Sequence, residues 1–425
     1  MKLPEPRDFL RSLFNVAVKA ADPALSLAAH LPSPPENGRT VVVGAGKGSA
    51  QMARALEDLW PGPLTGTVVT RYGYGCATRS IDVLEASHPV PDEAGITAAQ
   101  RLLDTIASLS ENDLVIALIC GGGSALLPAA PSGFTLEDEI ELNSTLLASG
   151  APISAMNAVR KHFSRIKGGR LAAVTKAKVV SLVISDIPGD NPALISSGPT
   201  IPDRTTRHDA LRVIKQYSLA IPDRVLDFIG SSDADAPQPE NPIFSRNHHQ
   251  VIASARVSLE AAAALARSSG IEAHILSDAI EGEARDVAAV HGAIAAEIAR
   301  RNQPFVSACV LLSGGETTVT VRSKGGRGGR NGEFALALSP WIDGLDVHAL
   351  VADTDGIDGS EENAGAFIDG TTAGRILENG MDVRDVLSRH DSYSVFSMLN
   401  DLFVTGPTGT NVNDFRAILI LPHQR

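Results

Sequence analysis

The sequence of 425 residues is poor in cysteine and in aromatic residues, and it contains no long apolar run. Its three cysteines, Cys76, Cys120 and Cys309, are odd in number and far apart. This spacing argues against a disulfide framework or a cysteine-based zinc site and indicates a reducing compartment. No stretch approaches the roughly 18 apolar residues of a membrane span, and the N-terminus has no apolar signal core. We therefore expect a cytoplasmic protein without a membrane partner.

Basic charge is also scarce. The chain has 37 basic and 49 acidic residues, which gives a net charge of −12. A general affinity for nucleic acid is therefore not expected, and an anionic substrate would need a locally basic pocket. The hydrophobic content of 44% and charged content of 20% are ordinary for a globular protein. The length predicts about two or three domains.

A strand followed by a glycine-rich turn is the most informative stretch. The β-branched run Val41–Val43 predicts a buried strand, and Ser49 can cap a helix that begins near Ala50. Backbone N–H groups in such a turn, together with the helix dipole, attract an anion, and Lys47 adds a full positive charge. The turn predicts a phosphate or carboxylate site. Its glycines are Gly44, Gly46 and Gly48.

This turn matches neither common nucleotide motif. A Walker A loop would need glycine where Val41 stands and Ser or Thr where Gly48 stands. The dinucleotide fingerprint needs an acidic ribose partner about 20 residues on. The next strand ends instead in Arg71, which leaves NADP open. Strand–turn–helix packing without a ligand is the alternative.

Two further glycine clusters follow apolar runs. Leu114–Cys120 predicts a strand buried on both faces, and a glycine turn with the layout of the first follows it. If both strands are parallel, the two turns face one crevice. Val306–Leu312 also leads into glycines, although a strand over Thr317–Arg322 can follow there. The phosphate-binding residues expected in these clusters are Gly122, Gly123, Ser124, Gly314 and Gly315.

The segment Ser154–Lys167 predicts a helix with a basic face. Asn157, Arg160 and Lys161 are spaced i, i+3 and i+4, so they share one side. The face is either solvated or lines the anion crevice, where it would bind substrate.

Several loops carry polar residues suited to phosphate chemistry. The loop after Val179–Ile184 contains Asp186 and Asp190, which suit Mg²⁺ or serve as turn residues. It also contains Ser197, a candidate phosphate-binding residue. The loop Ser323–Glu333 holds Lys324, Arg327 and Arg330 among five glycines and can close over phosphates or lie on the surface. Asp353 and Asp355, which follow the strand Leu350–Ala352, are candidate metal ligands or proton acceptors. His88 lies on a Pro-rich loop and is either a ligand contact or structural.

The Pro-rich, polar stretch Ser231–Pro242 predicts a linker, and a strand–helix pattern restarts near Gln250. We expect two α/β domains over residues 1–240 and 241–425, the first with a Rossmann-like, doubly wound parallel sheet.

Taken together, the motifs resemble those of the glycerate 2-kinase family, which has an N-terminal glycerate-kinase-associated region and a C-terminal MOFRL domain. The resemblance covers nearly the whole chain in order. It is carried by VVVGAGKGSAQMA, SHPVPDEAG, CGGGSALLPAA, NAVRKHFSRIKGGRLA, SDIPGDNPALISSGPT, LSGGETTV, GRGGRNGEFALA, ADTDGIDGS and DLFVTGPTGTNVND.

This resemblance implies ATP- and Mg²⁺-dependent phosphorylation of D-glycerate to 2-phosphoglycerate, in an active site between two α/β domains. It also implies that Lys47 and an arginine of the RGGRN segment, Arg327 or Arg330, are required. Members of the family are often labelled hydroxypyruvate reductase, so an NAD(P)H-dependent reductase is the alternative. A non-catalytic protein that binds a small anion is a third reading. The sequence leaves the oligomeric state open, with a homodimer as one expectation.

Phosphoryl transfer depends on positioning and charge neutralisation, which gives each candidate a role. Lys47 and the loop arginine would offset charge on the transferred phosphoryl group. The basic helix face, Asn157, Arg160 and Lys161, would hold the glycerate carboxylate or a phosphate. Asp186 or Asp190 would carry Mg²⁺, and Asp190 or Asp355 would accept the proton of the 2-hydroxyl.

Overall fold

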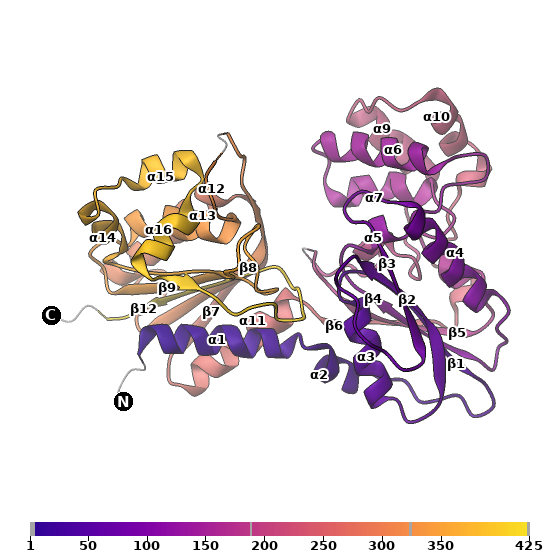
Figure 1. Cartoon of the computed structure of the whole chain (residues 1–425), viewed down its shortest axis with the longest axis horizontal. Coiled ribbons are helices and arrows are strands. Elements are labelled where there is room, and N and C mark those ends of the chain that lie inside the picture. Colours follow the sequence, from indigo (N-terminus) through magenta and orange to yellow (C-terminus); the bar gives the residue numbers. More distant parts are fainter. Residues whose placement is uncertain (1–4, 188, 323–324, 423–425) are drawn as a thin grey trace. The chain divides into compact units, whose positions relative to one another are not determined.

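The computed structural model describes residues 5–187, 189–322 and 325–422. They form the two compact α/β units of Figure 1. The N-terminal unit comprises Pro23–Ser185 and Asp190–Ile252. The C-terminal unit comprises Met1–Asp22, Asp186–Gly189 and Ala253–Arg425. The prediction of two α/β domains is confirmed.

The N-terminal unit is built on a six-stranded sheet in the order β3-β2-β1-β4-β5-β6, the order of a Rossmann fold. Strands β1 to β5 pair in parallel. The central strands β1 and β4 are buried along their whole length, which explains their continuous apolar runs. The strands are β1 Thr40–Ala45, β2 Leu64–Arg71, β3 Ile81–Ala86, β4 Leu114–Ile119, β5 Lys178–Ile184 and β6 His248–Ala253.

Helices of this unit cover the sheet and form a separate helical layer. The layer has its own core, in which the rings of Phe134, Phe163 and Phe228 meet edge to face at 4.8 to 5.8 Å. Its helices α6, α7, α9 and α10 lie together in Figure 1. The helices are α2 Pro23–Ala28, α3 Ser49–Leu59, α4 Glu93–Ala107, α5 Gly123–Leu126, α6 Leu136–Ala148, α7 Ile153–His162, α8 Arg170–Ala173, α9 Arg207–Gln216 and α10 Asp223–Gly230, with short turns η1 Ile195–Ser197, η2 Ser232–Ala234 and η3 Pro242–Phe244.

The C-terminal unit has a mixed sheet in the order β11-β10-β9-β12-β8-β7. Only the β7–β8 pair is parallel among the pairings described. Strand β12 lies between β8 and β9, at the centre of this sheet. The strands are β7 Glu272–Glu283, β8 Cys309–Thr318, β9 Val347–Asp353, β10 Gly365–Asp369, β11 Leu402–Phe403 and β12 Asp414–Ile420.

Alternating side chains of this sheet pack into two hydrophobic cores, one on each face of the sheet. Cys309 and Leu311 of β8 join the core under α12 and α13, whereas Val310 and Leu312 join the core under α1 and α11. This alternation is the period of two expected of a strand covered on both faces. The helices are α1 Pro6–Ala20, α11 Ala255–Ser268, α12 Ala284–Arg301, α13 Arg330–Leu338, α14 Thr372–Glu378, α15 Val383–Arg389 and α16 Ser392–Leu399, with the turn η4 Ser339–Trp341.

The unit boundaries differ from the expected division at residue 240. The apolar face of helix α1 is buried in the C-terminal unit, where Phe14 meets Phe403 edge to face at 4.9 Å. At the other boundary, β6 lies beside β5 in the first sheet. The first unit therefore continues to Ile252.

The Pro-rich stretch 231–242 is not a linker but packs on the N-terminal unit. Arg170 donates hydrogen bonds to the carbonyl oxygens of Ala234 (2.9 Å) and Asp235 (3.0 Å), and Ala234 is buried. Composition predicted a solvated segment because it cannot reveal a distant arginine that satisfies these carbonyls.

The third glycine cluster does not form a turn. Gly314 and Gly315 lie within β8, beside an irregularity in its register with β7. A Cβ on Gly315 would lie 2.2 Å from the backbone nitrogen of Ile280, and its φ is +111°. Close strand packing therefore explains Gly315, and the prediction of a strand–turn arrangement here is wrong.

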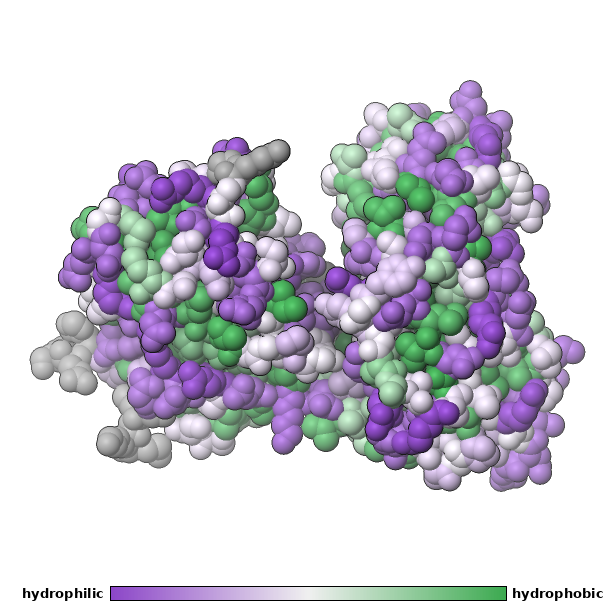
Figure 2. Space-filling model, in the orientation of Figure 1, coloured by the Kyte–Doolittle hydropathy of each residue, from purple (hydrophilic) through white to green (hydrophobic). Residues whose placement is uncertain are grey.

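None of the described helices is long and apolar enough to cross a bilayer. On the face shown in Figure 2, hydrophilic residues are interspersed with apolar ones.

A buried ion pair joins helix α6 to the segment that follows α7. The side chains of Lys167 and Glu139 are 2% and 3% exposed and pair with each other. Glu139 also accepts a hydrogen bond from the backbone N–H of Ala129 at 2.9 Å.

We predict that Lys167→Met lowers the free energy of unfolding by about 3–5 kcal/mol, because it leaves the carboxylate of Glu139 buried without a counter-charge. Urea unfolding followed by circular dichroism measures the loss. Lys215→Met, at an exposed lysine, is the control and should change stability by less than about 0.5 kcal/mol. Adding Glu139→Gln to Lys167→Met should recover part of the loss, and equal losses in the two lysine variants would contradict the prediction.

Candidate active site

Lys47 lies at the switch point of the N-terminal sheet, where β1 and β4 are neighbours and their connections run to opposite sides. Its backbone N–H donates to the carbonyl oxygen of Gly121 at 2.8 Å, and its carbonyl oxygen accepts from Thr70 Oγ1 at 2.9 Å. The lysine therefore starts from a backbone position that is anchored to the ends of both neighbouring strands.

The backbones of the first two glycine turns lie so close together that a side chain at Gly46 would not fit between them. A Cβ on Gly46, whose φ is +133°, would lie 2.3 Å from the carbonyl oxygen of Cys120. The N–H of Gly48 donates to Cys120 Sγ at 3.1 Å. A Cβ on Gly44 would lie 2.7 Å from the carbonyl oxygen of Leu118. The two turns predicted to share one edge of the sheet are thus in direct contact.

His88 and Arg71 add to this edge. A Cβ on Gly122 would lie 3.1 Å from Lys47 Cγ and 3.2 Å from His88 Nε2, so both side chains adjoin the second turn. Burial, together with the charges of Lys47 and Arg71, lowers the pKa of His88 to about 4. The guanidinium of Arg71 lies 4.3 Å from the ring centre of Tyr74. The histidine is therefore neutral at pH 7 and two cations surround it.

The serines of the turn η1 form hydrogen bonds with the second glycine turn. Ser196 Oγ donates to the carbonyl oxygen of Cys120 at 2.6 Å and accepts from the N–H of Gly123 at 3.0 Å. Ser197 Oγ lies 2.6 Å from Ser124 Oγ and donates to Asn157 Oδ1 at 2.9 Å. Both serines have positive φ, a conformation that costs about 1–3 kcal/mol and concentrates at functional sites.

The predicted basic face divides in the structure. Asn157 adjoins Ser197, but Arg160 donates to Asn143 Oδ1 at 2.7 Å and the buried Lys161 pairs with Asp203. Periodicity placed the three side chains on one side of a helix correctly, yet it could not show that the two cations already have protein partners.

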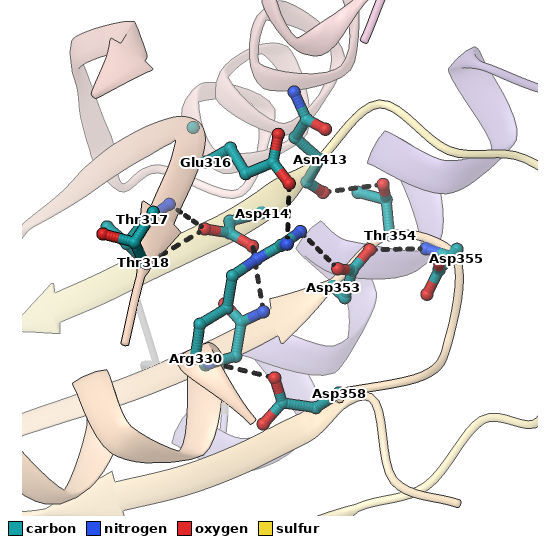
Figure 3. Close-up of polar contacts among 12 residues, drawn as sticks. Glu316, Thr317, Thr318, Arg330, Asp353, Thr354, Asp355, Asp358, Asn413 and Asp414 are labelled. Carbon is teal, nitrogen blue, oxygen red and sulfur yellow. Dashed lines mark hydrogen bonds and ion pairs between the residues drawn. The ribbon is translucent and has the colours of Figure 1, made fainter. Parts of the chain in front are cut away.

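A second cluster of charge lies in the C-terminal unit around Arg330, the first residue of α13 (Figure 3). Arg330 Nε donates to Asp414 Oδ1 at 2.7 Å, Nη1 to Glu316 Oε1 at 2.8 Å and Nη2 to Asp353 Oδ2 at 2.7 Å. Asn331 Nδ2 also donates to Asp414 Oδ1, at 2.9 Å.

Carboxylates outnumber cations here. Burial and the charge of Asp355 raise the pKa of Asp353 well above its usual range. For Asp414, burial is outweighed by Arg416 and Arg330, which hold its pKa below the usual range. Within the described residues, the buried Oδ1 of Asn331 has no hydrogen-bond partner. The excess of carboxylates in this cluster favours the binding of a further cation.

Sequence reasoning singled out Asp353 but not Asp414 or Glu316. Each stands at or near the end of a buried apolar strand, a position that could have flagged them. Their common signal, a carboxylate next to a strand covered on both faces, is too frequent to be decisive without the sheet order.

Arg327 lies apart from this cluster. Its side chain is 56% exposed, pairs with Glu361 and lies 4.2 Å from the ring centre of Tyr393. Lys324, expected in the same basic loop, lies outside the described residues.

The two predicted metal ligands fall in different units. Asp186 belongs to the C-terminal unit, where its carbonyl oxygen accepts from Asn413 Nδ2 at 2.6 Å, and Asp190 belongs to the N-terminal unit. No group of three or more His, Cys, Asp or Glu side chains arranged to hold a metal occurs in the described ranges. A metal here would need oxygens from a ligand or from water.

Comparison with known proteins places the chain in a family. Residues 9–230 match the profile described as a domain of unknown function, DUF4147, and residues 309–414 match the MOFRL family. A glycerate 2-kinase of Pyrococcus horikoshii is 42% identical over 88% of this chain and 86% of its own length. The chain belongs to the glycerate 2-kinase family. The predicted resemblance is therefore confirmed.

Other members of the glycerate 2-kinase family are similar along nearly their full length. A relative from Agrobacterium vitis, provisionally named hydroxypyruvate reductase, is 47% identical over 97% of this chain and 94% of its own. The crystal structure of a Thermotoga maritima glycerate kinase superposes with a TM-score of 0.88 at 36% identity, covering 97% of this chain and 99% of that one.

We predict that His88 titrates near pH 4 and that Lys47→Met raises its pKa, because one of the charges opposing protonation is removed. The pKa should stay below 6.5, since burial is the larger cause. NMR titration of histidine-labelled protein measures both values. Since the folded pKa is depressed, the unfolded chain binds more protons between about pH 4 and 6.5, and this group alone lowers stability as the pH falls through that range.

Lys178→Met, at the start of β5 and thus at the opposite end of the parallel sheet, is the matched control and should leave the His88 titration unchanged. A His88 pKa that does not respond to Lys47→Met would contradict the placement of the two side chains.

Proposed function

We propose that this protein transfers the γ-phosphoryl group of ATP to the 2-hydroxyl of D-glycerate, with Mg²⁺, giving 2-phosphoglycerate. Kinase chemistry needs little from the protein beyond positioning and charge neutralisation. The observation that carries the proposal is Lys47, fixed between two touching glycine turns at the sheet switch point of a chain in the glycerate 2-kinase family.

The edge of the N-terminal sheet is suited to polyphosphate. No side chain caps the N-terminus of α3, so that end of the helix is left to attract an anion. Lys47 and Arg71 contribute full charges beside it, and the neutral His88 can donate a hydrogen bond without adding repulsion between cations. We assign the phosphates of ATP to Gly44, Gly46, Gly122, Gly123 and Lys47.

We assign the binding site of the acceptor substrate, D-glycerate, to the residues beside η1. Ser124 and Ser197 carry hydroxyls next to the second glycine turn, and Asn157 orients Ser197. Arg160 and Lys161 have other partners, so their contribution would be to hold α7 in place rather than to contact glycerate. The proton acceptor stays a choice between Asp190 and Asp355.

Of the two arginines, we assign Arg330 rather than Arg327 to contact the transferred phosphoryl group. Arg330 lies in the acidic cluster of the C-terminal unit, whereas Arg327 points its charge to solvent and Glu361. Asp353 and Asp355 offer carboxylate oxygens of the kind that Mg²⁺ takes. When bound, Mg²⁺ neutralises charge on the phosphates. Asp186 and Asp190, the ligands predicted from the sequence, stay candidates.

This proposal requires the edge of the first sheet and the Arg330 cluster to meet around one metal–nucleotide complex. An active site between the units therefore stays a prediction. A cytoplasmic location and a homodimer also stay predictions, which cell fractionation and light scattering would test.

We predict that the purified protein converts D-glycerate and ATP to 2-phosphoglycerate and ADP only when Mg²⁺ is present. Phosphorus NMR separates the 2-phospho from the 3-phospho product, and chelation of Mg²⁺ should abolish turnover. Parallel incubation with hydroxypyruvate and NADH or NADPH tests the reductase alternative. Oxidation of NAD(P)H without formation of a phosphoglycerate would refute the kinase proposal.

We predict that Lys47→Ala lowers kcat roughly 10³-fold, the scale on which a cation at the transferred phosphoryl group acts in other kinases and GTPases. The thermal unfolding midpoint should change little, because the anchoring bonds of Lys47 use its backbone. Lys178→Met serves again as control and should retain wild-type turnover. Near-normal kinase activity of Lys47→Ala would reject the assigned role.

A further inference from the structure

Helix α13, which begins with the proposed catalytic Arg330, is capped by a residue from another segment. Asp358 Oδ1 accepts from the N–H of Asn331 at 2.9 Å, and Oδ2 accepts from the N–H of Gly332 at 2.8 Å. The residue at the N-cap position, Gly329, has no side chain to do this. Both oxygens of one buried carboxylate thus satisfy two free N–H groups of the first turn.

Two glycines make room for this carboxylate. A Cβ on Gly329 would lie 2.3 Å from Asp358 Oδ1, and a Cβ on Gly332 would lie 3.2 Å from Oδ2. The approach of Asp358 therefore explains Gly329, whereas a Cβ on Gly328 or Gly332 would first meet Ser392 Oγ, at 2.2 and 2.6 Å. These glycines need not indicate a mobile loop.

The capping segment also holds the arginine itself. Asp353, in the same Asp353–Gly359 stretch, accepts from Arg330 Nη2 at 2.7 Å. The backbone N–H of Asp358 donates to the carbonyl oxygen of Asn363 at 2.7 Å, which fixes the far end of the stretch. One segment thereby positions both the backbone and the guanidinium of Arg330.

We infer that Asp358 is a positioning residue for phosphoryl transfer, which holds the first turn of α13 so that the Arg330 guanidinium stays where the reaction needs it. The inference rests on the proposed function, because that function gives Arg330 its role.

Ionisation of Asp358 supplies a readout for this role. Burial raises its pKa to about 6, against the hydrogen bonds from Asn331 and Gly332, and with Asp414 and Arg330 as the charges that face it. Protonation replaces one acceptor with an O–H that cannot pair with an N–H donor. The cap therefore weakens as the pH falls below about 6.

The effect on stability has the opposite sign. Because the folded pKa lies above the ordinary 3.8, the folded state binds more protons than the unfolded chain between about pH 4 and 6. This group alone makes the fold more stable as the pH falls through that range. Protonation of Asp358 therefore does not itself favour unfolding, and circular dichroism controls for the other groups that titrate in this range.

The test compares Asp358→Asn with the wild type from pH 5 to 8, measuring kcat and both KM values. Asparagine keeps the shape and one acceptor oxygen but turns an amino group toward the second N–H. We expect kcat at pH 7.5 to fall roughly 10-fold or more while each KM changes less than about threefold. The wild-type decline in kcat near pH 6 should be absent from the variant, while circular dichroism shows both proteins folded.

Asp382→Asn is the matched control, because Asp382 caps α15 by accepting from the N–H of Arg384 at 2.7 Å and lies far from Arg330 along the chain. It should leave kcat and its pH profile unchanged. In the Arg330→Lys background, Asp358→Asn should lower kcat less than threefold further, since two residues that act as one unit are not additive.

If the wild type phosphorylates glycerate and Asp358→Asn retains its kcat and its decline near pH 6, the inference is wrong and the proposed function stands. If the wild type shows no kinase activity, the proposed function fails, and amide hydrogen exchange decides on the positioning. Faster exchange at Asn331 and Gly332 in Asp358→Asn would support it, and unchanged exchange would overturn it. Should Asp358→Asn not fold, Asp358→Glu takes its place, because it keeps the carboxylate but displaces it from the N–H groups of Asn331 and Gly332. The same fall in kcat with little change in either KM is expected, and a retained kcat would overturn the inference.

Discussion

The contact between the chain segments that follow β1 and β4 is the constraint on which the N-terminal unit depends. At Gly46 the backbone of one segment comes so close to Cys120 that any side chain would collide with a carbonyl oxygen. This proximity lets the N–H of Lys47 reach Gly121 and the N–H of Gly48 reach a cysteine sulfur. A lysine with a flexible side chain thereby gains a rigid base, and its charge is held at the point where a Rossmann-like sheet offers a crevice.

In the C-terminal unit the main physical constraint is the burial of charged side chains. Arg330 is held by three carboxylates, and Arg416 pairs with Asp414 in the core. Buried ion pairs are weak evidence for stability because desolvation offsets their attraction. Shifted pKa values within one such cluster point instead to function. The two units differ in this respect, since the first offers N–H groups and cations at the end of its sheet and the second offers carboxylates.

Much of the fold could be predicted because its signals are local. The continuous apolar runs of β1 and β4, the face of α1 with Phe14 and the glycine turn around Lys47 are each contained within a few consecutive residues. The predictions that failed depended on distant partners. Arg170 binds the carbonyls of the stretch 231–242, and the backbone of Ile280 leaves no space for a side chain at Gly315. Neither partner is near its target in the sequence.

The candidate site divides in the same way. By itself the sequence determined that Lys47 follows a buried strand, that glycine turns recur after such strands, and that the motifs are those of the glycerate 2-kinase family. Only the tertiary structure decided that Arg330 joins Asp353 and Asp414 while Lys161 is already paired with Asp203. The physical reason is that residue type and spacing set the chemistry a side chain can perform and the face of an element on which it stands. Whether its charge has a partner depends on strand order and packing, which bring together residues that are distant in the sequence.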